Sequence, residues 1–155
     1  MKKFIMAALM AVTFGQVSAD GVKMRDVFRE MPDSLMPYLS LNNRLDFIDF
    51  LDSGMKAEVR NTLGGMSEMT SMADDSLSIR MSDGLRVDML VMDSTVVMIE
   101  TFLVDFIYGE SRVNYFTTKW IPLQQPCLSE AQEQRISRLK LQNIVKRDDD
   151  LLKKR

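Results

Sequence analysis

Three aspartates spaced three residues apart are the first group in the sequence that could do chemistry. Asp46, Asp49 and Asp52 lie in a segment with helical periodicity, so their carboxylates fall near one another along one side of a helix. Such a group could bind a hard cation or supply the two carboxyl groups of an acid–base pair. A calcium loop, however, needs a tight turn containing glycine, and carboxylates on an exposed helix are usually only solvated. We therefore predict a solvated helix face and no metal site.

A carboxylate-dependent hydrolase, for instance one acting on glycans, remains an open alternative. Glycosidases need two carboxyl groups about 5–10 Å apart across a cleft, and spacing along the chain does not establish such a pair. The paired Asp74 and Asp75 are typical of a turn before a strand, and Gly64-Gly65 lacks the Lys-Ser or Lys-Thr of a phosphate-binding loop. The acids available to such an enzyme are Asp46, Asp49, Asp74, Asp75, Asp105 and Glu110.

Composition excludes several common enzyme classes. The 155-residue chain contains no histidine, so it cannot build a Ser-His-Asp or Cys-His arrangement and lacks the usual ligands of a catalytic zinc. Its formal net charge of −2 gives no global attraction to nucleic acid. Cys127 is the single cysteine and has no disulfide partner within the chain. We predict no catalytic residues, no cofactor and no nucleic-acid partner.

The first 19 residues have the pattern of a secretory signal peptide. Lys2 and Lys3 precede an apolar run over residues 4–14, and Val17-Ser18-Ala19 places small or short residues where signal peptidase cleaves. We expect cleavage after Ala19 and a periplasmic or secreted protein without a lipid anchor. No later segment is apolar for long enough to span a bilayer, so no transmembrane segment is expected in the mature chain.

The remaining chain predicts an α+β fold. N-terminal helices pack on an antiparallel β-meander of four to five strands, and a C-terminal helix follows. We expect helices over residues 22–31, 43–53 and 129–146, strands over 76–81, 85–92, 95–106 and 112–120, and a weaker strand over 68–72. The predicted α+β domain spans residues 20–123, and residues 124–155 form a linker, the C-terminal helix and a frayed basic tail.

Both faces of the predicted sheet carry apolar side chains. The N-terminal helices cover one face, so the other needs a cover: the C-terminal segment, a second chain or a ligand. The candidate binding residues on the sheet are Leu90, Met92, Met98 and Phe102. They predict a non-enzymatic secreted or periplasmic module that binds a protein or envelope component. The alternative is a carrier of a small ligand or peptide, with a helix–sheet pocket lined by Phe47, Phe50, Met89 and Ile99. The oligomeric state stays open.

Several segments together resemble a domain-of-unknown-function family of small secreted proteins from Gram-negative gut anaerobes. The segments are Asp26-Val-Phe-Arg-Glu-Met-Pro-Asp-Ser-Leu-Met-Pro-Tyr-Leu39, Asn43-Arg-Leu-Asp-Phe-Ile-Asp49, Gly54-Met-Lys-Ala-Glu-Val59, Leu63-Gly-Gly65 and residues 105–120, which end in Ser111-Arg-Val-Asn-Tyr-Phe-Thr-Thr-Lys-Trp120. The resemblance covers residues 22–123 and leaves out the C-terminal helix. It implies export and a single α+β domain, and it supplies no catalytic residues.

Overall fold

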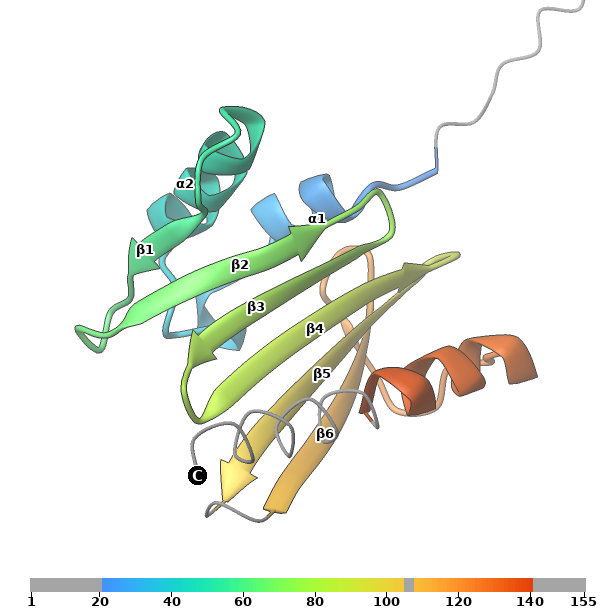
Figure 1. The fold of residues 1–155 in the computed structure, drawn as a ribbon. Helices are drawn as coiled ribbons and strands as arrows, with labels where there is room; N and C mark the ends of the chain where they lie inside the picture. Colours follow the sequence, from blue (N-terminus) through green and yellow to red (C-terminus); the bar gives the residue numbers. More distant parts are fainter. Residues whose placement is uncertain (1–20, 105–107, 141–155) are drawn as a thin grey trace, which may run out of the picture.

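The computed structural model describes residues 21–104 and 108–140, which form an antiparallel sheet of seven strands with helices on both faces. Each strand pairs with the next one along the chain, and Figure 1 shows this order from β1 to β6. The strands are β1 Glu58–Arg60, β2 Met66–Met72, β3 Ser76–Ser82, β4 Leu85–Met92, β5 Thr95–Val104, β6 Tyr108–Thr117 and β7 Pro122–Leu123. The helices are α1 Met24–Arg29, the 3-10 turn Asp33–Leu35, α2 Leu41–Asp52 and a C-terminal helix whose described part is residues 130–140.

The prediction of an α+β meander is confirmed, but the predicted number of strands is too low. The weak strand is present as β2, and the two further strands are β1 and β7. β1 has three residues and β7 has two, so neither is long enough to show alternation of polar and apolar residues. β7 also begins at Pro122, a residue type that argues against a strand unless the strand lies at a sheet edge.

Local hydrogen bonds fix both ends of α2. Ser40 is the N-cap, and its hydroxyl accepts a hydrogen bond from the Asn43 amide while the Asn43 side chain accepts one from the Ser40 amide. At the other end Gly54 adopts φ 66°, and the Met55 amide donates to the Phe50 carbonyl at 2.8 Å. With Ser40 as its cap, the helix begins at Leu41, two residues before the start that the sequence pattern predicts.

The sheet separates two apolar clusters. The larger one lies between the sheet and the N-terminal helices, and it contains Phe28, Phe47, Met89 and Trp120. The Trp120 indole donates to the Val27 carbonyl at 2.9 Å and thereby joins the turn between β6 and β7 to α1. The smaller cluster lies on the opposite face, where the C-terminal helix packs on the sheet with buried residues Leu90, Met92, Val97, Ile99 and Ile136.

A buried arginine holds the irregular connection between α1 and α2. Arg44 is 1% exposed, and its guanidinium donates to the carbonyls of Met31 at 2.6 Å and Leu39 at 3.0 Å. It also donates to the exposed carboxylate of Asp33 at 2.8 Å. The carbonyl acceptors lie in a segment interrupted by two prolines, so the guanidinium supplies donors that no regular helix or strand provides there.

We predict that Arg44→Met destabilises the protein by about 2–5 kcal/mol. Methionine keeps much of the side-chain volume but leaves two buried carbonyls without a donor, and each such loss costs about 1–3 kcal/mol. Urea unfolding followed by circular dichroism measures the change. Arg80→Met is the control, because its ion pair with Glu68 is half-exposed and should contribute less than about 1 kcal/mol. Equal losses in the two variants would contradict the role assigned to Arg44.

Candidate functional site

The four predicted binding residues do not form one surface. Leu90 and Met92 are 2% and 5% exposed and lie in the smaller cluster under the C-terminal helix. Met98 is 4% exposed in the larger cluster, and Phe102 packs against that cluster from the same face. The reason is the register: Met89 pairs with Met98 and Leu90 with Val97, so even positions of β4 share a face with odd positions of β5. The alternation of side chains within one strand does not show which positions of the neighbouring strand share its face.

Part of the chain's own C-terminal segment covers Leu90 and Met92. Ile136 is buried against them, and Leu128 and Leu139 pack around it. Of the three covers expected for this face, the C-terminal segment is therefore the one present over these residues. The face that carries Leu90 and Met92 is therefore covered in part by the C-terminal helix. A binding site on this face must lie beside that helix.

Three polar contacts set the position of this helix. A capping box begins it, with Ser129 and Gln132 exchanging hydrogen bonds of 2.8 and 3.3 Å. The Gln132 amide then donates to Asp93 at 3.0 Å, and Arg135 pairs with Asp75 at 2.7 Å. Asp93 and Asp75 lie in turns near the C-terminal end of β4. The capping box follows from the local spacing of Ser129 and Gln132, whereas these two tethers join residues distant in sequence.

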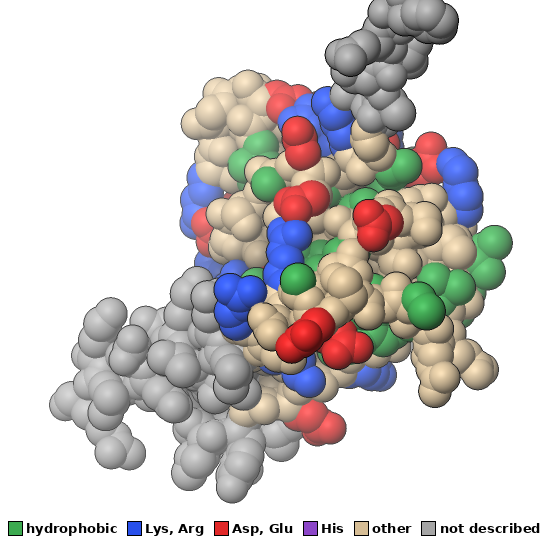
Figure 2. Space-filling view, turned by 90° about the vertical axis from the view of Figure 1, so that its right-hand side faces the viewer, with side chains coloured by type: hydrophobic (Ala, Val, Ile, Leu, Met, Phe, Trp, Pro, Cys, Tyr) green, Lys and Arg blue, Asp and Glu red, His purple; other side chains and the backbone are tan. Residues whose placement is uncertain are grey.

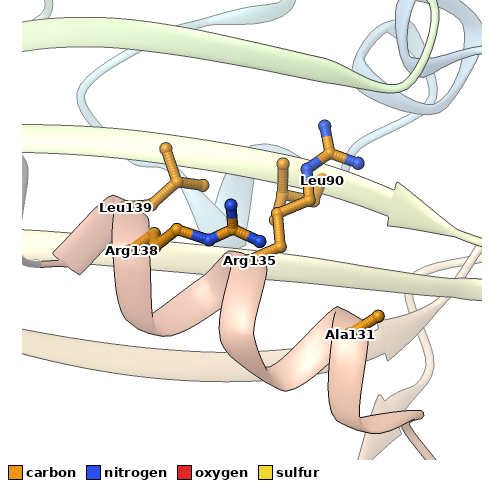
Figure 3. A pocket seen from close by; sticks show the side chains of 5 residues that line it. All are labelled: Leu90, Ala131, Arg135, Arg138 and Leu139. Atoms are coloured by element: carbon orange, nitrogen blue, oxygen red, sulfur yellow. The ribbon is translucent and has the colours of Figure 1, made fainter.

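A shallow groove of about 390 Å³ lies between this helix and β4. Figure 3 shows its lining: Arg135 and Leu139 extend from the helix toward the strand that carries Leu90, and Arg138 lies between them. The apolar part of the lining is Leu90, Ala131 and Leu139. The groove thus joins an apolar floor to two guanidinium groups, which favours a ligand that is anionic and partly apolar.

The two guanidinium groups are not equally engaged. Arg135 is held by Asp75, and hydrogen bonding by this guanidinium lowers the pKa of the Asp75 carboxyl from its ordinary value. Arg138 donates a long hydrogen bond of 3.4 Å to the Gln134 carbonyl and forms no ion pair with a carboxylate among the described residues. Arg138 is therefore the better-placed donor for a ligand anion.

Two of the aspartates considered for chemistry, Asp52 and Asp75, have pKa values shifted in the direction opposite to that of a general acid. Such an acid needs a raised pKa, whereas hydrogen bonding by Arg25 at 2.6 and 2.7 Å lowers the pKa of Asp52, and Arg135 does the same for Asp75. Asp46, Asp49, Asp74 and Glu110 are exposed, and Asp105 lies outside the described residues. Within residues 21–104 and 108–140, His, Cys, Asp and Glu form no group of three that could hold a metal ion.

The residues considered for a carrier pocket do not surround a common space. Phe47 and Met89 are fully buried in the larger cluster, with Phe50 packed against it. Ile99 is fully buried in the smaller cluster on the opposite face. The sequence analysis did not predict the groove at the C-terminal helix. Its lining combines Leu90 with residues more than 40 positions later in the chain, and of these only Leu90 lies in a segment with a strong apolar pattern.

Charges of both signs are intermingled over the side of the molecule drawn in Figure 2. Several charged residues form ion pairs between neighbouring elements, such as Arg25 with Asp52 and Lys119 with Glu30. These pairs neutralise part of the surface locally. Arg138 differs from them, because its guanidinium has no carboxylate partner in the described part of the chain.

Comparison with protein-family models identifies a match over residues 16–150 to the family described as "Protein of unknown function (DUF3256)". The chain belongs to this DUF3256 family. The matched range continues through the helix that forms one wall of the groove, beyond the residue at which the resemblance seen in the sequence ended. A comparison with curated proteins gives no match.

The fold of this DUF3256 protein is similar to a solved structure described as a domain of an uncharacterized protein from Porphyromonas gingivalis W83. The TM-score is 0.55 at 23% sequence identity, and the match covers 68% of this chain and 59% of that chain. At this identity the similarity concerns the fold alone. In the described part of the DUF3256 chain, none of the helices has both the length and the apolar character needed to cross a membrane.

We predict that Arg135→Gln raises the pKa of the Asp75 carboxyl toward its ordinary value of about 3.9. The pairing keeps this pKa low in the folded state, so it stabilises the fold above that pH and is lost as the pH falls through the folded-state pKa. Carboxyl-carbon NMR titration of Asp75 measures the change. Arg138→Gln removes an equal charge without touching Asp75 and should leave the titration in place. An unchanged Asp75 titration in Arg135→Gln would show that the helix does not dock as described.

Proposed function

We propose that this protein is a non-catalytic binding module that holds an acidic, partly apolar peptide segment of an envelope or secreted protein in the groove between β4 and residues 130–140. The observation that carries the proposal is the pair of guanidinium groups from one helix beside an apolar floor. Guanidinium groups form strong, directional hydrogen bonds with carboxylates, and the adjacent leucines favour aliphatic side chains.

The dimensions of the groove support a segment of chain rather than an enclosed ligand. Its volume of about 390 Å³ is at the lower end of the range for small-ligand sites, and it is open to solvent along the helix. An extended peptide presents alternate side chains to such a surface. Acidic side chains could then meet Arg138 while apolar ones contact Leu90 and Leu139.

A carrier of a small amphipathic anion is the second candidate, because the same chemistry would accept a fatty-acid carboxylate. The sequence-based expectation of export agrees with either ligand. A carboxylate-dependent hydrolase has the least support, because two of the aspartates considered for chemistry, Asp52 and Asp75, are held by arginines.

The test uses a ten-residue peptide in which pairs of glutamates alternate with pairs of leucines, so that each face of the extended chain carries both residue types. A peptide with lysine in place of glutamate is the control ligand. In ¹⁵N–¹H NMR spectra of the protein, we expect the acidic peptide to shift the amides of Leu90, Ala131, Arg135, Arg138 and Leu139. Arg138→Glu should weaken the binding by about tenfold or more, since a charge-assisted hydrogen bond contributes about 1.5–3 kcal/mol. Lys23→Glu changes the net charge equally at an exposed site beside α1 and should bind like the unaltered protein.

Decanoate serves as the second ligand and separates the two candidates. Shifts at the groove with decanoate but not with the acidic peptide would favour the carrier. Shifts elsewhere, or equal binding by Arg138→Glu and the unaltered protein, would contradict the groove as the site.

A further inference from the structure

At one margin of the sheet, several backbone groups have no pairing partner among the described residues. β6 pairs with β5 through ten consecutive residues, but β7 covers the other edge of β6 only at Tyr115 and Phe116. Over residues 109–113 no described residue pairs with that outer edge. Figure 1 shows β6 at the margin of the sheet opposite β1.

The hydrogen-bond pattern identifies which residues of β6 point their backbone groups outward. The Thr117 amide donates to the Ile121 carbonyl at 2.9 Å, so Thr117 faces the β7 side. In an antiparallel strand this orientation repeats every second residue. The amide and carbonyl groups of Gly109, Ser111 and Val113 therefore point away from β5, toward the open edge.

Three of the devices that usually protect a sheet edge are not present in this part of β6. Proteins shorten edge strands, interrupt them with bulges or place proline in them. β1 and β7 have three and two residues, whereas β6 has ten, no proline, and a regular register with β5. Its two charged residues, Glu110 and Arg112, have opposite signs and would not repel every incoming strand.

The sequence of this edge is complementary to itself. In an antiparallel pairing of two copies about a two-fold axis at Ser111, Gly109 of each copy faces Val113 of the other. Glu110 of each copy then faces Arg112 of the other, and this charge pair occurs twice. This register also fits the direction of the backbone groups. The odd-numbered residues, whose amides and carbonyls point outward, form the hydrogen-bonded pairs.

We propose that a second copy of this chain pairs with the outer edge of β6, so that the two sheets join into one continuous antiparallel sheet. Arg112 lies on the face of the sheet where this charge pair would form, and within the chain its guanidinium contacts two residues of β5. Its guanidinium donates to Glu100 at 2.8 and 2.9 Å and lies 5.4 Å from the centre of the Phe102 ring. The Glu110 carboxylate is exposed and forms no ion pair with any residue of 21–104 or 108–140, which leaves it available to the other copy.

This contact is independent of the proposed groove. Glu110 and Arg112 project from the face of the sheet that carries Phe116 and the larger cluster. The groove lies on the opposite face. Variants of one surface leave the other intact, so the two proposals can fail separately.

Sedimentation equilibrium of the chain expressed from its full sequence tests the pairing with two charge reversals. Glu110→Arg brings two guanidinium groups face to face at each of the two contacts, and Arg112→Glu brings two carboxylates face to face there. We expect each single variant to self-associate about tenfold or more weakly than the unaltered protein, because two attractive contacts become repulsive. An equimolar mixture of the two variants should restore the dimer, since every facing pair in the heterodimer has opposite charges.

The control variant reverses a charge at the other margin of the sheet, in β1. Glu58→Arg in β1 changes the net charge as Glu110→Arg does and should leave association unchanged. Arg112→Glu places a carboxylate opposite Glu100 within the chain, so circular dichroism checks that this variant folds. If it does not fold, Ser111→Pro replaces it: proline removes an outward amide at the centre of the pairing and should also abolish the dimer.

Three results would overturn the pairing. The first is a chain that is monomeric at about 100 µM, a concentration above the roughly micromolar dissociation constant of a weak specific dimer. The second is unchanged association of Glu110→Arg. The third is failure of the two folded charge variants to associate when they are mixed.

Discussion

The packing of the N-terminal helices depends on the buried guanidinium of Arg44. α1 has six residues, too few to be stable alone, so its position must be imposed by what surrounds it. The following segment contains Pro32 and Pro37 and cannot form a continuous helix or strand. Arg44 donates to carbonyls on both sides of this segment and so holds α1 and α2 over the same face of the sheet. Met24 and Phe28 can then be fully buried.

The opposite face of the sheet is covered in a different way, by the C-terminal helix. Its apolar area is small, and a helix with only two apolar side chains in the smaller cluster among its described residues, Ile136 and Leu139, covers it. A helix with so narrow an apolar stripe leaves its neighbouring positions to polar side chains. Arg135 and Arg138 occupy those positions, which is why a groove with an apolar floor and a cationic rim lies beside the contact. The groove is thus a consequence of the small number of helix side chains that pack on the sheet.

Local patterns predicted much of this fold. The alternation in residues 76–92 gives the β3–β4 hairpin, and Ser129 with Gln132 gives the cap of the C-terminal helix. Both signals lie within a few residues of the structure they determine. β1 is too short to carry such a signal, and its place beside β2 depends on contacts across the turn at Asn61, whose side chain accepts hydrogen bonds from the amides of Leu63 and Gly65.

The candidate site was harder to predict because it depends on relations between strands. Leu90 and Met98 both look like inward residues of a meander, and only the register between β4 and β5 assigns them to opposite faces. The same principle applies to the sheet margin at β6. Its outward backbone groups become visible once Tyr115 and Phe116 are seen to be the residues that β7 covers. The two proposed binding surfaces lie where a covering element ends: beside a narrow helix on one face and beyond a two-residue strand at one edge. Their locations are set by the lengths of the covering elements, which explains why neither surface has a motif of its own in the sequence.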